Sequence, residues 1–411
     1  MAAIKPFRCV RPEVSVADRV AALPYDVYNR KEAKAEVERE PLSFLKIDRA
    51  ETSFDDSVDT YAPEVYAKAK ELLQKDIQDG IYERDEQEAY YIYELVMDGR
   101  SQTGLVACAS VDDYVNCVIK KHENTRADKE VDRITHVDTC SAQTGPIFLA
   151  YRSNQIINDI VEKAKKESPL YDFTAVDGIS HRVWKVAAKE DIEAIQKAFS
   201  EIDRIYIADG HHRAASAVKV GLKRREENPA NTGSEEYNFF LSVLFPDDQL
   251  MIMDYNRTVK DLNGLSTDEF IGRVKENFEV QKSDTPVKPS VKGQFGMYLE
   301  KQWYCLTAKK SLFEGKDAVG SLDVSVLQDY LLGPVLGIGD PRTDARIDFV
   351  GGIRGLSELE KRADGDMKIS FSMYPTSIME LFDVADQNLL MPPKSTWFEP
   401  KLRSGLFIHE I

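Results

Sequence analysis

The sequence lacks the signatures of several large protein classes. Only five of its 411 residues are cysteine, they are widely separated, and none forms a Cys-x-x-Cys pair. An odd number of scattered cysteines is typical of free thiols in a reducing compartment and argues against a disulfide framework. No apolar run approaches the length of a membrane span, and the first residues contain no signal-peptide core. We therefore expect a cytoplasmic protein without a membrane partner.

The sequence has fewer basic than acidic residues. The chain has 54 Lys and Arg against 70 Asp and Glu, which gives a formal net charge of −16. This balance argues against nucleic acid as a partner, although it leaves room for a local basic pocket that binds a phosphorylated ligand. Hydrophobic residues make up 43% and charged residues 30% of the chain, as in a foldable globular protein with two or three domains.

The common enzyme motifs are also missing. There is no Walker-type loop with a Lys-Ser/Thr ending and no Gly-x-Ser-x-Gly elbow. Gly333, Gly337 and Gly339 do not have the dinucleotide-binding spacing, and they follow a predicted helix instead of a strand. His122-Glu123 is not followed by a histidine at helical spacing, which excludes the zinc-protease pattern.

Helix and strand patterns alternate along the whole chain, which predicts a mixed α+β fold. Asn29 and Glu32 have the spacing of a capping box, and Asp98-Gly99 is a turn signal between two β-prone segments. We expect a helix over 31–40, a strand over 43–47 and a hairpin of strands 90–97 and 103–111.

The composition of residues 228–234, which are rich in Asn, Pro, Gly and Ser, is the most linker-like in the chain. We place a domain boundary there. The predicted domains are an N-terminal α/β region, 1–230, and a C-terminal α+β region, 231–411, of unknown role.

One stretch combines several chemically useful residues. Apolar residues 205–208 predict a central strand, Asp209-Gly210 a tight turn, and residues 214–223 a helix. The start of a helix has unpaired N–H groups, which together with Arg213 suit an anion such as phosphate. The alternative is an ordinary strand-turn-helix connection with exposed histidines.

A second polar stretch, 120–139, contains Lys121, His122 and Glu123. Such a run is usually a solvent-exposed helical face. It also allows a metal site, which would combine His122 and Glu123 with Asp209 and either His211 or His212.

The Asp209–Arg213 segment resembles the phosphate-binding motif of the ParB/sulfiredoxin-like superfamily, which includes free-serine kinases. Over nearly its full length the chain resembles the bacterial family called domain of unknown function 1015. The segments that carry this resemblance are 23–27 (LPYDV), 121–125 (KHENT), 208–213 (ADGHHR) and 391–401 (MPPKSTWFEPK). It implies a ParB/sulfiredoxin-like strand-turn-helix core with mixed sheets and a second α+β domain.

The resemblance also implies functions for individual residues. Gly210, His211, His212 and Arg213 would bind nucleotide phosphates, and Asp209 would lie beside the transferred phosphoryl group. Asp209 could there either accept the substrate proton or hold the metal. Lys121 and Lys394 are further candidates for phosphate binding, and both Lys394 and Lys401 belong to a tail that we expect to fold back over the site. Those kinases use a glutamate as base, for which Glu123 and Asp26 are candidates by residue type. The candidate catalytic residues are therefore Asp209, His211, His212 and Glu123.

We expect a phosphotransferase that acts on a small hydroxyl compound, plausibly L-serine, with Mg²⁺ and ATP or ADP. Phosphoryl transfer depends on positioning and charge neutralisation, which a helix start and basic side chains supply. Two alternatives stay open, a nucleotide-binding regulatory protein without turnover and a metal-dependent hydrolase. The chain could also form a homo-oligomer.

Overall fold

The computed structural model describes residues 1–125 and 127–411, and it excludes the side chains of 127–129. The chain forms two compact units, Met1–Leu250 with Pro400–Ile411 and Met251–Glu399. Residues 231–250 and 400–411, which the sequence places in the second domain, thus belong to the first unit. The reason is strand pairing, because a strand within 231–250 is central in the sheet of the first unit.

The first unit is built on a nine-stranded mixed sheet. Eight strands follow one another in the order β6 (Ile119–Lys120), β11 (Ile205–Asp209), β8 (Ile147–Tyr151), β12 (Phe239–Pro246), β5 (Arg100–Ser110), β4 (Tyr90–Met97), β10 (Ser180–Val186) and β9 (Tyr171–Thr174), and β1 (Ile4–Lys5) pairs with β5. The β6–β11 and β8–β12 pairs are parallel, and the others are antiparallel. Two small ladders pair β2 (Val10–Pro12) with β3 (Tyr82–Arg84) and β7 (Ala142–Gln143) with β21 (His409–Glu410).

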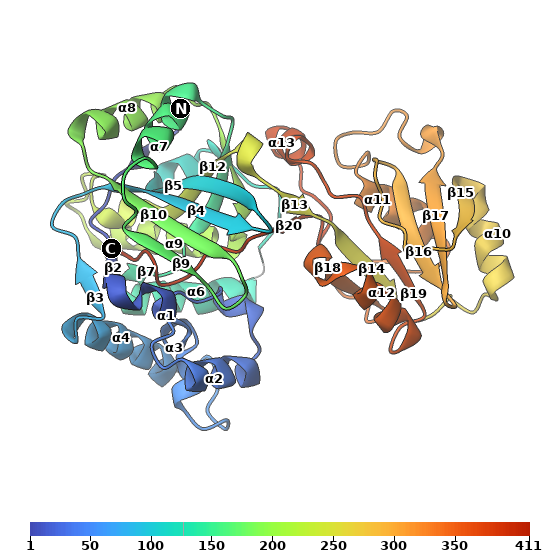
Figure 1. The fold of residues 1–411 in the computed structure, drawn as a ribbon, viewed down its shortest axis with the longest axis horizontal. Coiled ribbons are helices and arrows are strands. Elements are labelled where there is room, and N and C mark those ends of the chain that lie inside the picture. Colours follow the sequence, from blue (N-terminus) through green and yellow to red (C-terminus); the bar gives the residue numbers. More distant parts are fainter. Residues whose placement is uncertain (126) are drawn as a thin grey trace. The chain divides into compact units, whose positions relative to one another are not determined.

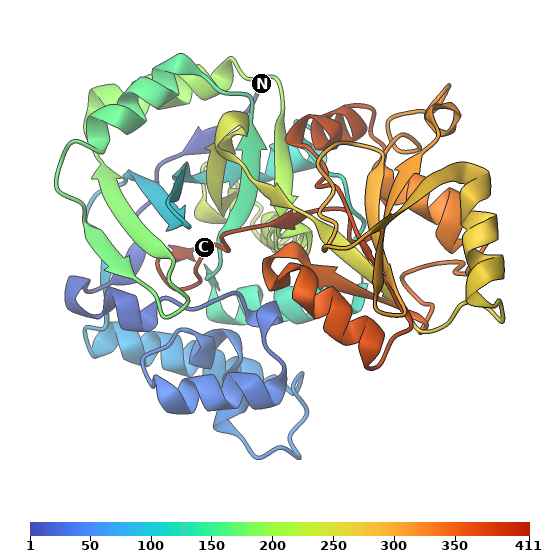
Figure 2. The same ribbon diagram turned by 45° about the vertical axis from the view of Figure 1, so that its right-hand side comes forward.

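Helices cover this sheet in groups (Figure 1). They are α1 (Ala17–Val20), α2 (Arg30–Arg39), α3 (Leu45–Asp48), α4 (Pro63–Gln78), α5 (Val111–Val115), α6 (Ala127–Cys140), α7 (Gln155–Ala164), α8 (Lys189–Ser200) and α9 (His211–Glu227). Helices α7 and α8 lie side by side, well apart from α1–α4 (Figure 2). Two apolar clusters result, one between the sheet and α7–α9 and one among α1–α4.

The second unit has a six-stranded antiparallel sheet. Its strands follow the order β15 (Phe278–Ser283), β17 (Gln302–Ala308), β16 (Gln294–Leu299), β19 (Ile369–Ser372), β14 (Tyr255–Val259) and β18 (Ile347–Gly351). Its helices are α10 (Thr267–Asn277), α11 (Asp323–Leu327), α12 (Gly355–Asp364) and α13 (Ile378–Asp386), and β13 (Ile252–Met253) pairs with β20 (Trp397–Phe398). Helix α12 packs on β19 and β14.

Several local predictions are confirmed. Asn29 and Glu32 form a complete capping box at the start of α2, and Asp98 and Gly99, both with positive φ, turn β4 into β5. The mixed α+β class is correct. The strand predicted over 43–47 is wrong, because this segment begins α3, and Leu45 and Ile47 are fully buried in a helical cluster. A short apolar run does not distinguish a strand from a buried helix.

The structure contains no candidate for a membrane-spanning helix in its described part. Within residues 1–125 and 127–411, no helix combines the length and apolar character that a bilayer requires.

Candidate functional site

The connection between β11 and α9 forms the centre of the site. The register of β11 against β8 shifts between Ile207 and Asp209, and such a bulge changes the direction of the next side chain. Gly210 follows with a φ of 93°, and α9 begins directly after it at His211, three residues earlier than the sequence predicts. A Cβ atom on Gly210 would lie 3.1 Å from Nη2 of Arg213. Only glycine therefore allows this turn without strain.

Asp209 is held as a carboxylate at the end of β11. Its Oδ1 accepts a hydrogen bond from the backbone N–H of Gly210 at 2.8 Å, and its Oδ2 lies 3.0 Å from Nζ of Lys401. Burial favours a higher pKa for Asp209, but the positive charges of Lys401 and Arg213 outweigh it, and the pKa is well below the ordinary value. Asp209 is consequently ionised at neutral pH.

The C-terminal tail of the first unit runs through the site. Its Ser404 forms a β-bridge with Ala22, and the N–H of Gly405 donates to the carbonyl of Thr144. Gly405 has a φ of 82°, and a Cβ atom there would lie 2.5 Å from Phe44. The backbone of the tail is thus fixed in place, and Lys401 reaches Asp209 from a defined direction.

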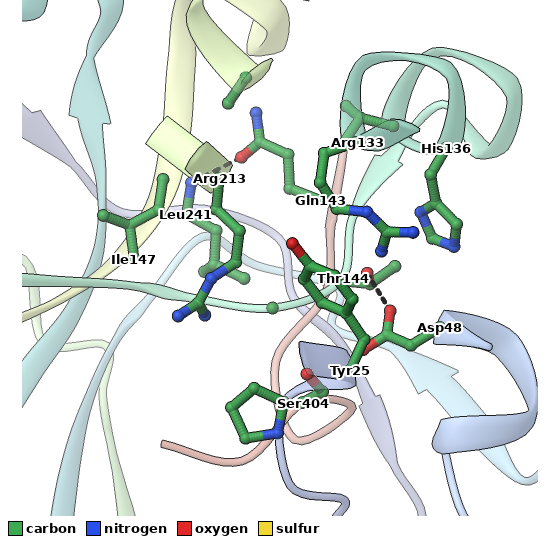
Figure 3. Close-up of a pocket in the computed structure, with 14 residues that line it drawn as sticks. Tyr25, Asp48, Arg133, His136, Gln143, Thr144, Ile147, Arg213, Leu241 and Ser404 are labelled. Carbon is green, nitrogen blue, oxygen red and sulfur yellow. Dashed lines mark hydrogen bonds between the residues drawn. The ribbon is translucent and has the colours of Figure 1, made fainter. Parts of the chain in front are cut away.

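A small cavity with a volume of about 30 Å³, partly open to solvent, lies beside α9 (Figure 3). Arg213, from the first turn of α9, and Arg133, from α6, both line it. The remaining lining residues are Pro24, Tyr25, Asp48, His136, Val137, Gln143, Thr144, Gly145, Ile147, Ala217, Leu241 and Ser404. The cavity therefore combines two guanidinium groups with a phenol and a hydroxyl-bearing loop.

The two arginines differ in their surroundings. Arg133 is buried and paired with Asp132 at 2.9 Å, and its guanidinium stacks over the ring of Tyr25 at 4.0 Å from the ring centroid. Arg213 donates through Nη1 to the carbonyl of Pro146 at 2.6 Å. Because a guanidinium carries five N–H donors, Arg213 can also donate to a ligand in the cavity.

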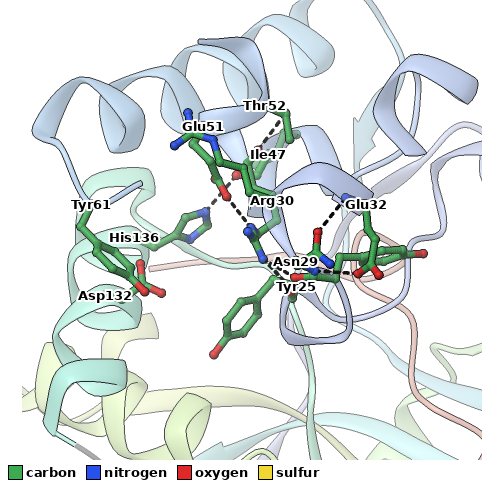
Figure 4. A network of polar contacts seen from close by, with 12 residues as sticks. Tyr25, Asn29, Arg30, Glu32, Ile47, Glu51, Thr52, Tyr61, Asp132 and His136 are labelled. Carbon is green, nitrogen blue, oxygen red and sulfur yellow. Dashed lines mark hydrogen bonds and ion pairs between the residues drawn. The ribbon is translucent and has the colours of Figure 1, made fainter. Parts of the chain in front are cut away.

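Tyr25 is positioned by a polar network (Figure 4). The guanidinium of Arg49 donates to the carbonyls of Tyr25 and Tyr28 at 3.1 and 2.6 Å, and it also pairs with buried Glu51. This contact holds the short 3₁₀ turn Tyr25–Val27 against the cavity. Asp26 in the same turn is exposed.

A second cluster adjoins Asp209. Strands β6 and β11 are parallel, so the segments that follow them leave the same edge of the sheet. This brings His122 and Glu123 to His211: the two imidazole rings meet edge to face at 4.5 Å, and Nδ1 of His211 lies 3.9 Å from Oε2 of Glu123. Burial lowers the pKa of His122 to about 4 and that of His211 well below its usual value, so both rings are neutral at pH 7.

The other predicted site residues lie in different surroundings. His212 is half-buried and interacts electrostatically with Glu130, and Lys121 is exposed with its ammonium over the ring of Tyr114. Lys394 belongs to the second unit, where its ammonium lies 5.6 Å from the centroid of the Tyr255 ring. Within the first unit, the structure therefore brings Asp209, Gly210 and Arg213 together with Lys401.

Sequence reasoning missed the cavity residues Arg133, Asp48 and Thr144. The polar run 120–139 is typical of an exposed face, yet Asp132, Arg133 and His136 are buried. Tyr25 could be noticed in the sequence only because it belongs to the LPYDV segment, 23–27. That segment supported the family resemblance but indicated no chemical role for Tyr25.

The sequence matches the model of the family described as protein of unknown function (DUF1015) over residues 4–325. The chain belongs to this family. No match among curated proteins is found.

Among solved structures, a free serine kinase in complex with AMP is 16% identical, with a TM-score of 0.35, and the match covers 74% of this chain and 92% of that one. A conserved hypothetical protein from Pyrococcus furiosus is 16% identical, with a TM-score of 0.35, and the match covers 74% of this chain and 94% of that one. C-terminally truncated SbnI from Staphylococcus aureus is 11% identical, with a TM-score of 0.38, and the match covers 73% of this chain and 85% of that one. Likeness at these TM-scores assigns no activity to this chain. The ParB/sulfiredoxin-like relationship stays a prediction.

Proposed function

We propose that this protein is a nucleotide-dependent phosphotransferase that acts on a small hydroxyl compound. The observation that carries the proposal is an ionised Asp209 at the start of α9, between Lys401 and Arg213 and close to a cavity lined by two arginines. The N-cap residue of α9 is Gly210, which has no side chain to cap the first turn, and the start of a helix suits phosphate oxygens.

Each residue has a part that follows from its position. Gly210 and the N–H groups of the first turn of α9 bind the phosphates of ATP or ADP, and Arg213 stabilises the charge on the transferred group. A strong base requires a pKa near the working pH, which Asp209 does not have. Asp209 therefore orients the attacking hydroxyl, which suffices for the loose transition state of phosphoryl transfer.

Magnesium is part of this proposal. A carboxylate beside a phosphate is repulsive unless a cation lies between them, and Mg²⁺ is usually bound by one or two carboxylates together with substrate phosphates. Asp209 is a suitable carboxylate for this, and the ion would neutralise charge on the donor phosphates. The unpaired cysteines agree with a cytoplasmic setting, which is also proposed.

L-Serine is the first substrate to test, since the Asp209–Arg213 segment resembles the phosphate-binding motif of free-serine kinases. Purified protein is incubated with Mg²⁺, either ATP or ADP, and a panel of hydroxy-amino acids, and phosphorylated product is measured. We expect product with at least one hydroxy-amino acid, and a loss of more than about 100-fold in Asp209→Asn. Arg213→Lys should weaken nucleotide binding, while Arg39→Lys, an exposed arginine on α2 paired with Glu36, is the matched control.

Two results would contradict the proposal. One is the absence of product with every donor and acceptor, and the other is an unchanged rate in Asp209→Asn. Nucleotide binding that requires Arg213 but gives no product would favour the regulatory alternative.

A further inference from the structure

A cluster of three side chains next to the proposed phosphate site has no part in phosphoryl transfer as proposed above. His122, Glu123 and His211 each offer a ligand atom, and the three atoms lie within 4.8 Å of one another. His122 and His211 are 2% and 6% exposed, and Glu123 lies at the surface. The cluster therefore has two buried nitrogen donors and one oxygen donor that faces solvent.

The environment of His122 indicates a ligand position. Its ring forms a hydrogen bond to the backbone of Ile207, while its Nδ1 atom is buried and has no hydrogen-bond partner among the described residues. Buried polar atoms in proteins are almost always satisfied, so an unpaired imidazole nitrogen needs an explanation. A metal-bound histidine has this arrangement, with one nitrogen on a backbone carbonyl and the other on the ion.

The spacing also suits a small cation. Ligand atoms of a tetrahedral zinc ion at bond lengths of about 2.0–2.1 Å are roughly 3.4 Å apart. Nδ1 of His211 and Oε2 of Glu123 are 3.9 Å apart, and the side chain of Glu123 is 48% exposed. A small movement of this surface-facing carboxylate closes the site without disturbing the two buried rings.

The scaffold fixes both histidines independently of any ion. His122 follows β6 and His211 begins α9, directly after Asp209 and Gly210, and the parallel pairing of β6 with β11 places the two segments side by side. The backbone N–H of His122 lies 3.5 Å from Nε2 of His211, and Nδ1 of the same ring faces Glu123 and is the atom that the ion would bind.

We propose that His122, His211 and Glu123 bind a zinc-class transition-metal ion, with a fourth position open to a water molecule or a ligand oxygen. Imidazole nitrogen favours zinc, copper, iron or nickel, whereas Mg²⁺ prefers an all-oxygen shell. Two histidines and one glutamate, with one position left open, form a known type of zinc ligand set. The site is therefore separate from the magnesium proposed at Asp209.

The test measures metal binding by the full chain. Protein stripped with a chelator is incubated with Zn²⁺, and the affinity is measured by competition with a chromophoric chelator. We expect a single ion per chain. His122→Gln and His211→Gln should each weaken binding by more than about tenfold, and Glu123→Gln by about tenfold. His212→Gln is the matched control, because His212 adjoins His211 on the same helix but lies outside the cluster, and its affinity should stay close to that of the wild type.

Cobalt substitution gives a second readout that needs no variant. Wild-type protein with Co²⁺ should show the intense visible bands of four- or five-coordinate cobalt, and Glu123→Gln, at an exposed position, should alter them even where a histidine variant fails to fold. Three results would overturn the proposal. They are weak six-coordinate cobalt bands, Zn²⁺ binding that is not stoichiometric, and an equal loss of Zn²⁺ affinity in His211→Gln and His212→Gln. Arg213→Lys should leave zinc binding intact, so failure of the metal site and failure of the phosphotransferase proposal are distinguishable.

Discussion

The ion pair between Asp209 and Lys401 allows a quantitative test of how the site is held. Replacing Lys401 with Met keeps most of the unbranched apolar side chain and removes the charge that lies 3.0 Å from the carboxylate. The pKa of Asp209 should then rise towards its ordinary value near 3.9, because burial favours the neutral acid and only the charge of Arg213 and the hydrogen bond from the N–H of Gly210 still oppose it.

The magnitude follows from the exposure of the two partners. A neighbouring cation lowers the pKa of an aspartate by about 1–3 units, and one unit corresponds to about 1.4 kcal/mol. The side chains of Lys401 and Asp209 are 19% and 37% exposed, so solvent screens part of the interaction. We therefore expect a coupling energy of about 1–2 kcal/mol, between that of an exposed pair and that of a fully buried one.

The assay is a double-mutant cycle of Lys401→Met and Asp209→Asn, with the free energy of unfolding measured by urea denaturation at several pH values. A carboxylate with a depressed pKa stabilises the folded state above its unfolded pKa, so the coupling should be complete at pH 7. It should shrink only as the pH falls through the depressed pKa of Asp209 in the folded protein, and vanish once Asp209 is protonated. The matched control is Lys223→Met, which breaks an exposed pair with Asp138 and should cost less than about 0.5 kcal/mol.

A coupling energy near zero at pH 7 would refute this reasoning, because it would mean that Lys401 does not control the ionisation of Asp209.

Three further predictions concern stability and are measured by urea unfolding. Gly210→Ala should cost about 1–2 kcal/mol because φ is 93°; no loss would argue against the left-handed turn. Gly221→Ala should destabilise by about 1–3 kcal/mol, since its Cβ would lie 2.4 Å from the carbonyl oxygen of Tyr237. The control Gly272→Ala, with open space around it in α10, should stabilise by up to about 1 kcal/mol. Burial, followed by the charge of nearby Arg403, lowers the pKa of His181 to about 3, so wild-type stability should fall as the pH drops from about 6.5 towards 3. His181→Gln should reduce that slope by about 1 kcal/mol per pH unit, and an unchanged slope would show that the histidine is not held neutral.

Local features of this protein were determined by the sequence itself. The capping box of α2, the Asp98-Gly99 hairpin and the turn from β11 into α9 each depend on a few neighbouring residues with specific backbone preferences. Residues adjacent in sequence are adjacent in space, so side-chain capping and a positive φ can be recognised without the fold.

Long-range pairing was decided only in the tertiary structure. Nothing local indicates that residues 239–246 join β5 and β8, that the last residues return to the first unit, or that Arg133 is buried against Tyr25. The segment 43–47 is helical because its apolar side chains pack in a cluster of helices, a contact that its own pattern does not encode.

The candidate site shows both kinds of information. Asp209, Gly210 and Arg213 were identifiable because they share one turn, whereas Lys401 reaches Asp209 across 192 positions of the chain. His122 and Glu123 meet His211 only because β6 and β11 are parallel neighbours, and strand order depends on burial of apolar surface over the whole sheet. The sequence thus determined the chemistry of each segment, and the tertiary structure decided which segments lie together, because contacts between distant residues depend on the packing of the entire unit.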